Sequence, residues 1–144
     1  MPFTGTYQRT IDSKGRLIVP SRLRDQLDRD QVVLTVWPDG CLSMWSGEGW
    51  ENLQSKLLAQ RQSSANSRAA VRKIASMAHA DQVDKQGRIT VPQELRDQAA
   101  ITREVVVTGA LDHGEIWSPE RWDAYQSRDA DQGGLDAFFE HLDL

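Results

Sequence analysis

Cysteine, histidine and long apolar runs are scarce in this chain of 144 residues, and each scarcity excludes a class of protein. The single cysteine, Cys41, has no partner for an intramolecular disulfide, which argues against an oxidising compartment. No run of 18 apolar residues occurs, and the first segment, MPFTGTYQRT, lacks the apolar core of a signal peptide. We therefore expect a soluble, cytoplasmic protein with no membrane partner.

Residues that commonly bind metals or carry out catalysis are few and scattered. His79, His113 and His141 lie far apart in the sequence without acidic or thiol companions at ligand spacing, so we expect ordinary surface or packing residues. SGEG at 46–49 is too short to form a phosphate-binding loop. The sequence therefore predicts a protein that is not an enzyme, with no catalytic residue, no metal and no cofactor.

The chain also lacks the overall positive charge that is typical of nucleic-acid-binding domains, since its net charge is −4. The charges are unevenly distributed, however. Residues 9–25 carry a balance of +3 and residues 61–73 a balance of +4, whereas residues 119–144 carry −5. This pattern indicates a basic face and an acidic tail.

What the chain does contain is an internal repeat. Residues 11–26 and 83–98 are identical at nine of sixteen positions, and the similarity continues from VVLT (32–35) to VVVT (105–108) and from MWS (44–46) to IWS (116–118). Two copies are too few for a solenoid, which needs three or more. We therefore expect a pseudo-twofold domain in which each half covers the apolar face of the other.

Each copy predicts the same order of elements: a weak strand, a tight turn, a short strand, a short helix and a β-hairpin. These are 6–11, 12–15, 16–19, 20–27 and 31–45 in the first copy, and 79–83, 84–87, 88–91, 92–99 and 104–117 in the second.

Helices are predicted between and after the copies. The first helix is capped by Ser46 and has an apolar stripe of Trp50, Leu53, Leu57 and Leu58. A polar break follows at 62–67. The second helix, at 68–78, has Val71, Ile74, Ala75 and Ala78 on one face. A third starts at Ser118-Pro119 and ends at Gly133-Gly134, and a fourth covers 135–142.

The motif Asp-x-x-Gly-Arg occurs once in each copy, from Asp12 to Arg16 and from Asp84 to Arg88. A single motif is typical of a plain turn, in which the Asp accepts backbone N–H groups, the Gly adopts an unusual dihedral angle, and the Arg starts a strand or pairs with the Asp. Two motifs on one pseudo-twofold face would gather several cations. Guanidinium groups suit phosphates and guanine edges, and a two-stranded ribbon fits the major groove.

We therefore predict that this face binds double-stranded DNA through Arg9, Lys14, Arg16, Arg22, Arg24, Lys85 and Arg88. Asp12, Gly15, Asp84 and Gly87 would shape the two turns. An alternative is a shared-proton carboxylate dyad of Asp12 and Asp84, as in aspartic proteases. The cations beside each Asp disfavour it, because they stabilise the ionised carboxylate.

The five tryptophans allow two interpretations. Trp45 and Trp117 occupy matched strand ends, and Trp50 and Trp122 occupy matched helices, whereas Trp37 lies alone in the hairpin. The apolar stripes favour packing in the core or between the repeats. Stacking on single-stranded bases is the alternative.

These motifs together resemble the MraZ family over residues 3–125. The resemblance rests on Phe3-Thr4-Gly5, DSKGRLIVPSRLR, the basic linker SRAAVRKIASMAHA, D-x-x-GRITVP-x-x-LR and GEIWSPERWDAY. It implies an α+β fold in which two tandem swapped-hairpin (SpoVT-AbrB-like) repeats intertwine into one pseudo-twofold domain with flanking helices. The implied divisions are repeat 1 at 5–49, a helical linker at 50–78, repeat 2 at 79–122 and an acidic tail at 123–144.

The resemblance also implies a function. Members of the family are transcriptional regulators, and we expect a nucleoid-associated repressor that binds direct repeats in the promoter of its own division and cell-wall operon as a ring-shaped homo-oligomer. The family signature falls on both Asp/Arg pairs. Lys14 fills the basic turn position in the first copy, whereas the second copy has Gln86 there with Lys85 beside it.

The alternative function is that of an antitoxin-like protein that blocks a protein partner with its C-terminal segment. Leu135, Phe138, Phe139 and Leu142 have helical spacing in the segment DADQGGLDAFFEHL. A helix that packs on the core or on a neighbouring subunit is a further interpretation of the same residues.

Overall fold

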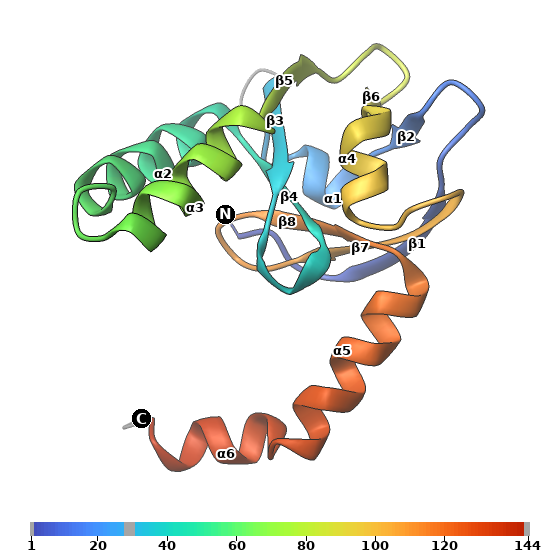
Figure 1. Ribbon diagram of the computed structural model, residues 1–144. Coiled ribbons are helices and arrows are strands. Elements are labelled where there is room, and N and C mark those ends of the chain that lie inside the picture. Colours follow the sequence, from blue (N-terminus) through green and yellow to red (C-terminus); the bar gives the residue numbers. More distant parts are fainter. Residues whose placement is uncertain (1, 28–30, 143–144) are drawn as a thin grey trace.

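The computed structural model describes residues 2–27 and 31–142, so residues 28–30 and the last two residues of the predicted acidic tail lie outside it (Figure 1). The first repeat contains β1 (Thr6–Thr10), β2 (Arg16–Ile18), α1 (Ser21–Arg24), β3 (Gln31–Val36), the 3₁₀ turn η2 (Pro38–Gly40) and β4 (Leu42–Trp45). The second contains β5 (His79–Gln82), β6 (Arg88–Thr90), α4 (Gln93–Gln98), β7 (Glu104–Gly109) and β8 (Gly114–Trp117). Helices α2 (Gly47–Gln60) and α3 (Ala65–Ser76) connect the repeats, and α5 (Pro119–Asp131) and α6 (Gly134–Glu140) follow them.

The two repeats exchange strands, which confirms the predicted swapped-hairpin fold. The six-stranded antiparallel sheet has the order β1-β7-β8-β4-β3-β5. The first strand of each repeat, β1 or β5, thus pairs with the hairpin of the other repeat, and the two hairpins meet where β4 pairs with β8. Neither repeat can complete its sheet alone, because a strand edge without a partner leaves backbone groups unpaired.

Two strand registers show the pseudo-twofold axis directly. Strands β2 and β6 form a separate two-stranded ribbon in which Leu17 lies opposite Ile89, its equivalent in the other repeat. In the middle of the large sheet Ser43 lies opposite Glu115, which is again its equivalent. A residue that lies opposite its own equivalent marks the place where the axis passes. The pseudo-twofold axis therefore passes through both the ribbon and the large sheet.

The main core contains apolar side chains from both repeats, in line with the prediction that the halves cover each other. Leu17 and Ile89, on the inner face of the ribbon, are each 1% exposed. Leu23 of α1 and Leu95 of α4 are buried in the same cluster, together with Ile11, Val19, Val32, Leu34, Leu42, Met44, Val91, Val105, Val107 and Ile116. Because this cluster is continuous, the repeats share one hydrophobic core.

A smaller aromatic cluster lies on the opposite face of the large sheet, since Val106 belongs to it while Val105 and Val107 face the main core. Trp117 is buried there and packs edge-on against Trp122, with ring centroids 5.3 Å apart. Trp45 stacks on His113, and Trp37 contacts both rings. Packing is therefore the observed role of these four tryptophans, while Trp50 is half-buried in α2.

His113 is a buried packing residue, in line with the sequence expectation, and it also has two acidic neighbours. Its ring nitrogens lie 2.7 Å from Asp112 Oδ1 and 2.9 Å from Glu115 Oε2. The tight connection between β7 and β8 gathers these neighbours, which is not a spacing expected of metal ligands. Burial alone would lower the pKa of His113, but the hydrogen bonds and charges of Glu115 and Asp112 outweigh it and raise the pKa above its ordinary value.

The helical linker is anchored beside β3. The Thr35 hydroxyl donates to the Ile74 carbonyl over 2.7 Å. Ser64 caps α3 by accepting from the Ser67 N–H, so this helix begins inside the segment predicted to be a polar break. Two residues of the predicted stripes were wrongly assigned: Leu58 is 54% exposed, and Ala75 is exposed as well.

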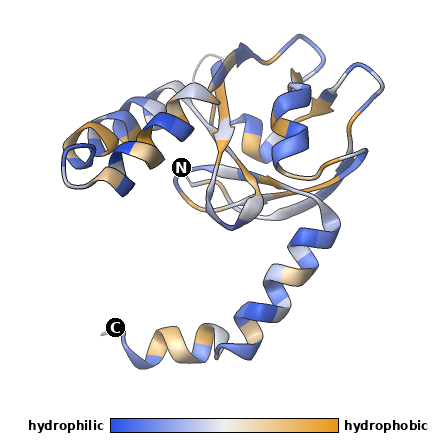
Figure 2. Cartoon of the chain, viewed as in Figure 1, coloured by the Kyte–Doolittle hydropathy of each residue, from blue (hydrophilic) through white to orange (hydrophobic). Residues whose placement is uncertain are grey.

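Helix α6 stands away from the sheet at the end of α5 (Figure 1). The Ser118 hydroxyl caps α5 as predicted, and Gly133 separates the two helices with a φ of 101°. Leu135 and Phe138 are 73% and 58% exposed, so the interpretation that this helix packs on the core is wrong (Figure 2). Among the described helices, none is long and apolar enough to cross a membrane.

Candidate nucleic-acid interface

The first turn is built around the Asp12 carboxylate. Its Oδ1 accepts the backbone N–H groups of Lys14 and Arg16, each over 2.9 Å, and the Gly15 N–H donates to the Asp12 carbonyl over 3.0 Å. Gly15 has a φ of 80°, a conformation that side chains disfavour. The turn predicted from Asp-x-x-Gly-Arg is thereby confirmed, with each residue in the role that its chemistry suggests.

The same carboxylate also orients the arginine that follows. Arg16 Nε donates to Asp12 Oδ2 over 2.9 Å, and the Arg16 side chain is 32% exposed. With Nε held by the Asp, the terminal Nη groups project from the turn. Those groups form the planar pair that matches O6 and N7 of guanine.

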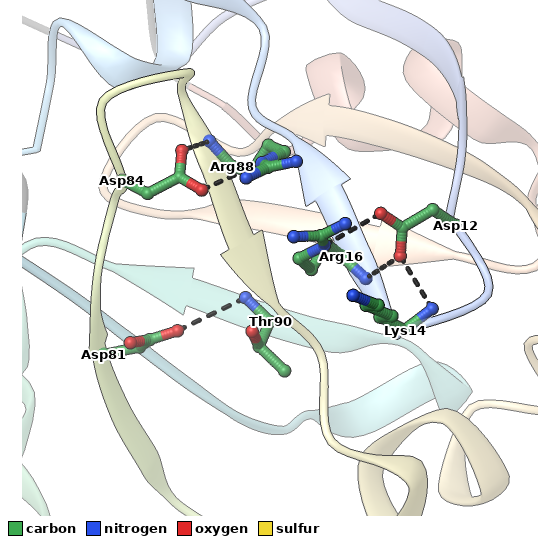
Figure 3. Close-up of polar contacts among 7 residues, drawn as sticks. All are labelled: Asp12, Lys14, Arg16, Asp81, Asp84, Arg88 and Thr90. Carbon is green, nitrogen blue, oxygen red and sulfur yellow. Dashed lines mark hydrogen bonds and ion pairs between the residues drawn. The ribbon is translucent and has the colours of Figure 1, made fainter.

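The second turn repeats this geometry. Asp84 accepts the backbone N–H groups of Gln86 and Arg88 over 2.9 Å, and Arg88 Nε donates to its Oδ2 over 2.8 Å. Gly87 also has a φ of 80°. Figure 3 shows the guanidinium groups of Arg16 and Arg88 lying between the two turn aspartates, above the ribbon.

The electrostatics of these aspartates disfavour the carboxylate dyad. The hydrogen bond from the backbone N–H of Arg16 is the main cause that lowers the pKa of Asp12. Burial opposes it, but the Arg16 side chain and the Lys14 N–H lower the pKa further, and the net shift is downward. The pKa of Asp84 is lowered in the same way, chiefly by the backbone N–H of Arg88. A shared-proton dyad needs one protonated carboxyl group, whereas each Asp here is held ionised by its own Arg.

The opposite repeat locks each turn in place. The Val19 N–H donates to the Gly87 carbonyl over 2.9 Å, and the Val91 N–H donates to the Gly15 carbonyl over 2.8 Å. These reciprocal bonds cross the pseudo-twofold axis. The two turns are therefore one rigid unit with a common orientation.

A second pair of arginines lies against these turns. A Cβ on Gly15 would lie 2.9 Å from Nη2 of Arg96, and a Cβ on Gly87 would meet the guanidinium of Arg24. Arg24 was predicted to bind DNA, and the structure places it half-buried, where its guanidinium packs on the turn of the other repeat. Arg96 was absent from the predicted site, although its identity with Arg24 in the aligned repeats was a usable signal.

The remaining predicted cations lie around the ribbon. Lys14 and Lys85 are exposed in the turns, and Arg22 is exposed in α1. Arg9 lies on β1, where its guanidinium covers the Tyr7 ring at 5.6 Å. The structure thus brings Lys14, Arg16, Lys85 and Arg88 together at the turns, whereas Arg9, Arg22 and Arg24 lie on the elements beside them.

The two ends of this surface differ in charge. Asp81 is the equivalent of Arg9, and its Oδ2 accepts the Thr90 N–H over 3.2 Å (Figure 3). Glu94 is likewise the equivalent of Arg22, and Gln86 that of Lys14. The surface around the first turn is therefore basic, while acidic side chains flank the second.

The described part of the chain holds no group of three His, Cys, Asp or Glu side chains placed to bind a metal ion. What this surface offers is two fixed, partly exposed guanidinium groups on a narrow antiparallel ribbon, with lysines at its rim. Such a surface can bind phosphates and base edges, and a two-stranded ribbon fits the major groove of DNA.

Comparisons with known proteins identify relatives of the whole chain. The family described as "MraZ protein, putative antitoxin-like" matches residues 2–73 and again residues 74–139. The transcriptional regulator MraZ of Heliobacterium modesticaldum is 46% identical over 128 residues, which cover 89% of each chain. The protein of the same name from Ligilactobacillus salivarius is 45% identical over 85% of each chain, and that from Desulforamulus reducens is 41% identical over 97% of this chain and 94% of its own.

Proposed function

This chain belongs to the MraZ family, and on that premise we propose that it is a DNA-binding transcriptional regulator whose ribbon and paired turns enter the major groove. The observation that carries the proposal is the pair of Asp-oriented arginines on one face. In both Asp12–Arg16 and Asp84–Arg88 the aspartate holds Nε, and no Nη group of either arginine is hydrogen-bonded to a residue that the structure describes. A preoriented guanidinium loses little conformational freedom when it binds, which favours specific contacts.

The ribbon register sets the spacing of the two arginines. Arg16 lies opposite Thr90, two residues from Arg88, so the two arginines are diagonal neighbours. Diagonal neighbours on an antiparallel pair are roughly 7–8 Å apart. Base pairs are stacked about 3.4 Å apart, so the arginines are spaced to contact guanines about two base-pair steps apart.

Phosphate binding should depend mostly on the first repeat. Lys14 and Arg22 are exposed there, whereas Gln86 and Glu94 occupy the equivalent positions of the second repeat. Acidic side chains repel phosphates, so the second turn relies on Lys85 and Arg88. We expect Arg88→Ala to weaken DNA binding less than Arg16→Ala for this reason.

The test is a gel-shift series on DNA from upstream of the gene that encodes this chain, at several salt concentrations. Arg16→Ala should weaken binding by about 1–3 kcal/mol per bound subunit and relax the sequence preference. Lys14→Ala should weaken specific and non-specific DNA alike and reduce the salt slope by roughly 0.9.

Asp12→Ala should reduce binding too, and it should lower the melting temperature because the turn loses its acceptor. Arg128→Ala, on the exposed surface of α5, is the matched control for the loss of one arginine. The assignment fails if folded Arg16→Ala binds the upstream DNA as tightly as the unchanged protein does.

The regulated DNA and the assembly are further parts of the proposal. A ring-shaped homo-oligomer would present several ribbons at once, and direct repeats in the promoter of its own operon would engage them together, with a gain in avidity. Occupancy of the promoter would repress the operon and keep the protein on the nucleoid. The exposed apolar side chains of α6 support self-association, because they leave a large apolar stripe uncovered.

A second candidate function is that of an antitoxin-like binder that captures a protein partner with α6. The exposure of Phe138 and Phe139 favours it. Its test is the neutralisation of a growth-arresting protein encoded beside this gene. The unchanged chain should restore growth, whereas a chain with Phe138→Ser and Phe139→Ser should not.

A further inference from the structure

An apolar side chain, Ile18, lies on the outer face of the ribbon and is 54% exposed. Among the large apolar residues that are exposed in the described ranges, Ile18 is the one that lies within a strand. Single exposed apolar residues are common on proteins, so exposure alone carries little weight. The position of Ile18 beside the residues proposed to contact DNA is what suggests a role for it.

The strand register places Ile18 among the residues proposed to contact DNA. Successive side chains of a strand point to opposite faces, and Leu17 and Ile89 face the core. The outer face therefore carries two cross-strand pairs, Arg16 with Thr90 and Ile18 with Arg88. Ile18 is thus directly opposite an arginine that Asp84 fixes in place.

An isoleucine beside a preoriented arginine complements one feature of the major groove. The C5-methyl group of thymine is the apolar group that the groove displays, and apolar side chains contact it. Isoleucine has no donor or acceptor, so its contact distinguishes thymine from cytosine by the methyl group. We propose that Ile18 is a specificity-determining residue that contacts a thymine methyl close to the guanine bound by Arg88. This proposal rests on the proposed function.

The geometry limits where that thymine lies. Directly opposite residues of an antiparallel pair have Cβ atoms about 4.5–5.5 Å apart. Given a base-pair spacing of about 3.4 Å, the thymine lies within about two base-pair steps of the guanine that Arg88 contacts. We expect this thymine on the same side of the guanine as Ile18 lies relative to Arg88.

The same contact gives each subunit a direction on DNA. The arginines are related by the pseudo-twofold axis, but the equivalent of Ile18 is Thr90, beside Asp81. Two arginines alone would bind a palindromic pair of guanines equally well in either orientation. Ile18 breaks that equivalence, because one orientation places its larger apolar side chain on the thymine methyl group, whereas the other places the smaller, partly polar Thr90 there. Oriented subunits suit direct repeats better than inverted ones.

The experiment uses the full-length protein and the upstream DNA in which thymines are replaced one at a time by deoxyuridine, which removes only the methyl group. We expect one thymine in each bound site whose replacement weakens binding of the unchanged protein about fourfold, the effect of burying one methyl group. Ile18→Ser should weaken binding to the thymine DNA by a similar factor. It should show no additional loss on the deoxyuridine DNA, because the two changes remove one contact.

Two further variants control for folding and for nonspecific effects. Ile18→Val keeps a branched apolar side chain and should retain sensitivity to the methyl group. Leu58→Ser alters an equally exposed apolar residue on α2 and should bind all the DNA fragments as the unchanged protein does. Thermal melts of each variant establish that the ribbon is intact.

The inference is overturned if no thymine replacement weakens binding, or if the critical replacement weakens the Ile18→Ser variant as much as the unchanged protein. Either result leaves the proposed function standing, provided that the unchanged protein retards the upstream DNA in preference to a control fragment. Loss of that preference in the unchanged protein would instead refute the proposed function.

Discussion

Separation of the two repeats should unfold both. We consider a fragment of residues 1–63, which ends in the exposed connection between α2 and α3. In this fragment β1 loses its partner β7, and β2 loses its partner β6. Strand β4 keeps β3 but loses β8. The hairpin β3–β4 would remain with both of its outer edges uncovered, which favours aggregation or a swapped dimer.

The size of the loss follows from the core. In the described parts of this fragment, 2–27 and 31–63, twelve apolar side chains besides Cys41 are buried: Phe3, Ile11, Leu17, Val19, Leu23, Leu27, Val32, Val33, Leu34, Leu42, Met44 and Trp45. Complete burial of one such side chain is worth about 1.5–3 kcal/mol. If half of them become exposed, the fragment loses roughly 9–18 kcal/mol. That is as large as the net stability of a typical domain, about 5–15 kcal/mol.

Light scattering after size exclusion, together with thermal melts by circular dichroism, measures the outcome. The fragment alone should aggregate, dimerise or stay unfolded. Coexpression with residues 64–144 is the matched control, and it should give a folded 1:1 complex because the chain is cut only at an exposed loop. A monodisperse 1–63 monomer with a cooperative melt would refute the view that the repeats depend on each other.

The other predictions concern the aromatic cluster and self-association. Because the folded pKa of His113 is raised above its unfolded value of about 6.5, its stabilisation is present below that pH and is lost as pH rises through the folded pKa. The free energy of unfolding measured in urea should therefore fall as pH rises above about 6.5, by at most about 1.4 kcal/mol per pH unit. His113→Gln should remove this dependence on pH, whereas the control variant His79→Gln should keep it. Native mass spectrometry should show assemblies larger than a dimer, and a pure 16.2 kDa species would contradict this. We expect acidic α6 to dock on basic α3 of a neighbouring subunit. A Phe138→Ser variant and an Arg72→Glu variant should then each fail to assemble alone but form dimers when they are mixed. If α6 instead contacts α6 of the neighbour, mixing the two variants would not restore assembly.

Much of the fold could be predicted because the same sequence motifs occur in both repeats, in the same order. The in-register motifs predicted the turns, the ribbon strands and the hairpins. Local chemistry predicted the caps at Ser46 and Ser118, since each hydroxyl precedes a helix and accepts an N–H three residues later. The roles of Asp12 and Gly15 within their turn were also deducible, because both act on residues within four positions of themselves.

Contacts between the repeats could not be predicted in the same way. The packing of Arg24 on Gly87 and of Arg96 on Gly15 depends on the swap, which brings residues about sixty or eighty positions apart into contact. The sequence shows where each arginine lies along the chain but not which turn its guanidinium group packs against. The packing partner of α6 could not be predicted either, because an apolar stripe predicts burial but does not identify the chain against which the helix packs.

The fused repeat explains which residues are alike in the two copies and which differ. The pairs that build the shared core and lock the turns are identical or similar: Val19 and Val91, Leu23 and Leu95, Leu17 and Ile89, and Arg24 and Arg96. Pairs that face outward around the ribbon differ in charge or polarity: Arg9 and Asp81, Lys14 and Gln86, Ile18 and Thr90, and Arg22 and Glu94. A homodimer of a single repeat would be obliged to present the same side chain at both positions of every such pair. Covalent fusion removes that obligation, because a change in one copy leaves the other unaltered. The inward pairs stay similar since each must fit the same core, while the outward pairs are free to give the proposed DNA-binding surface two distinct ends.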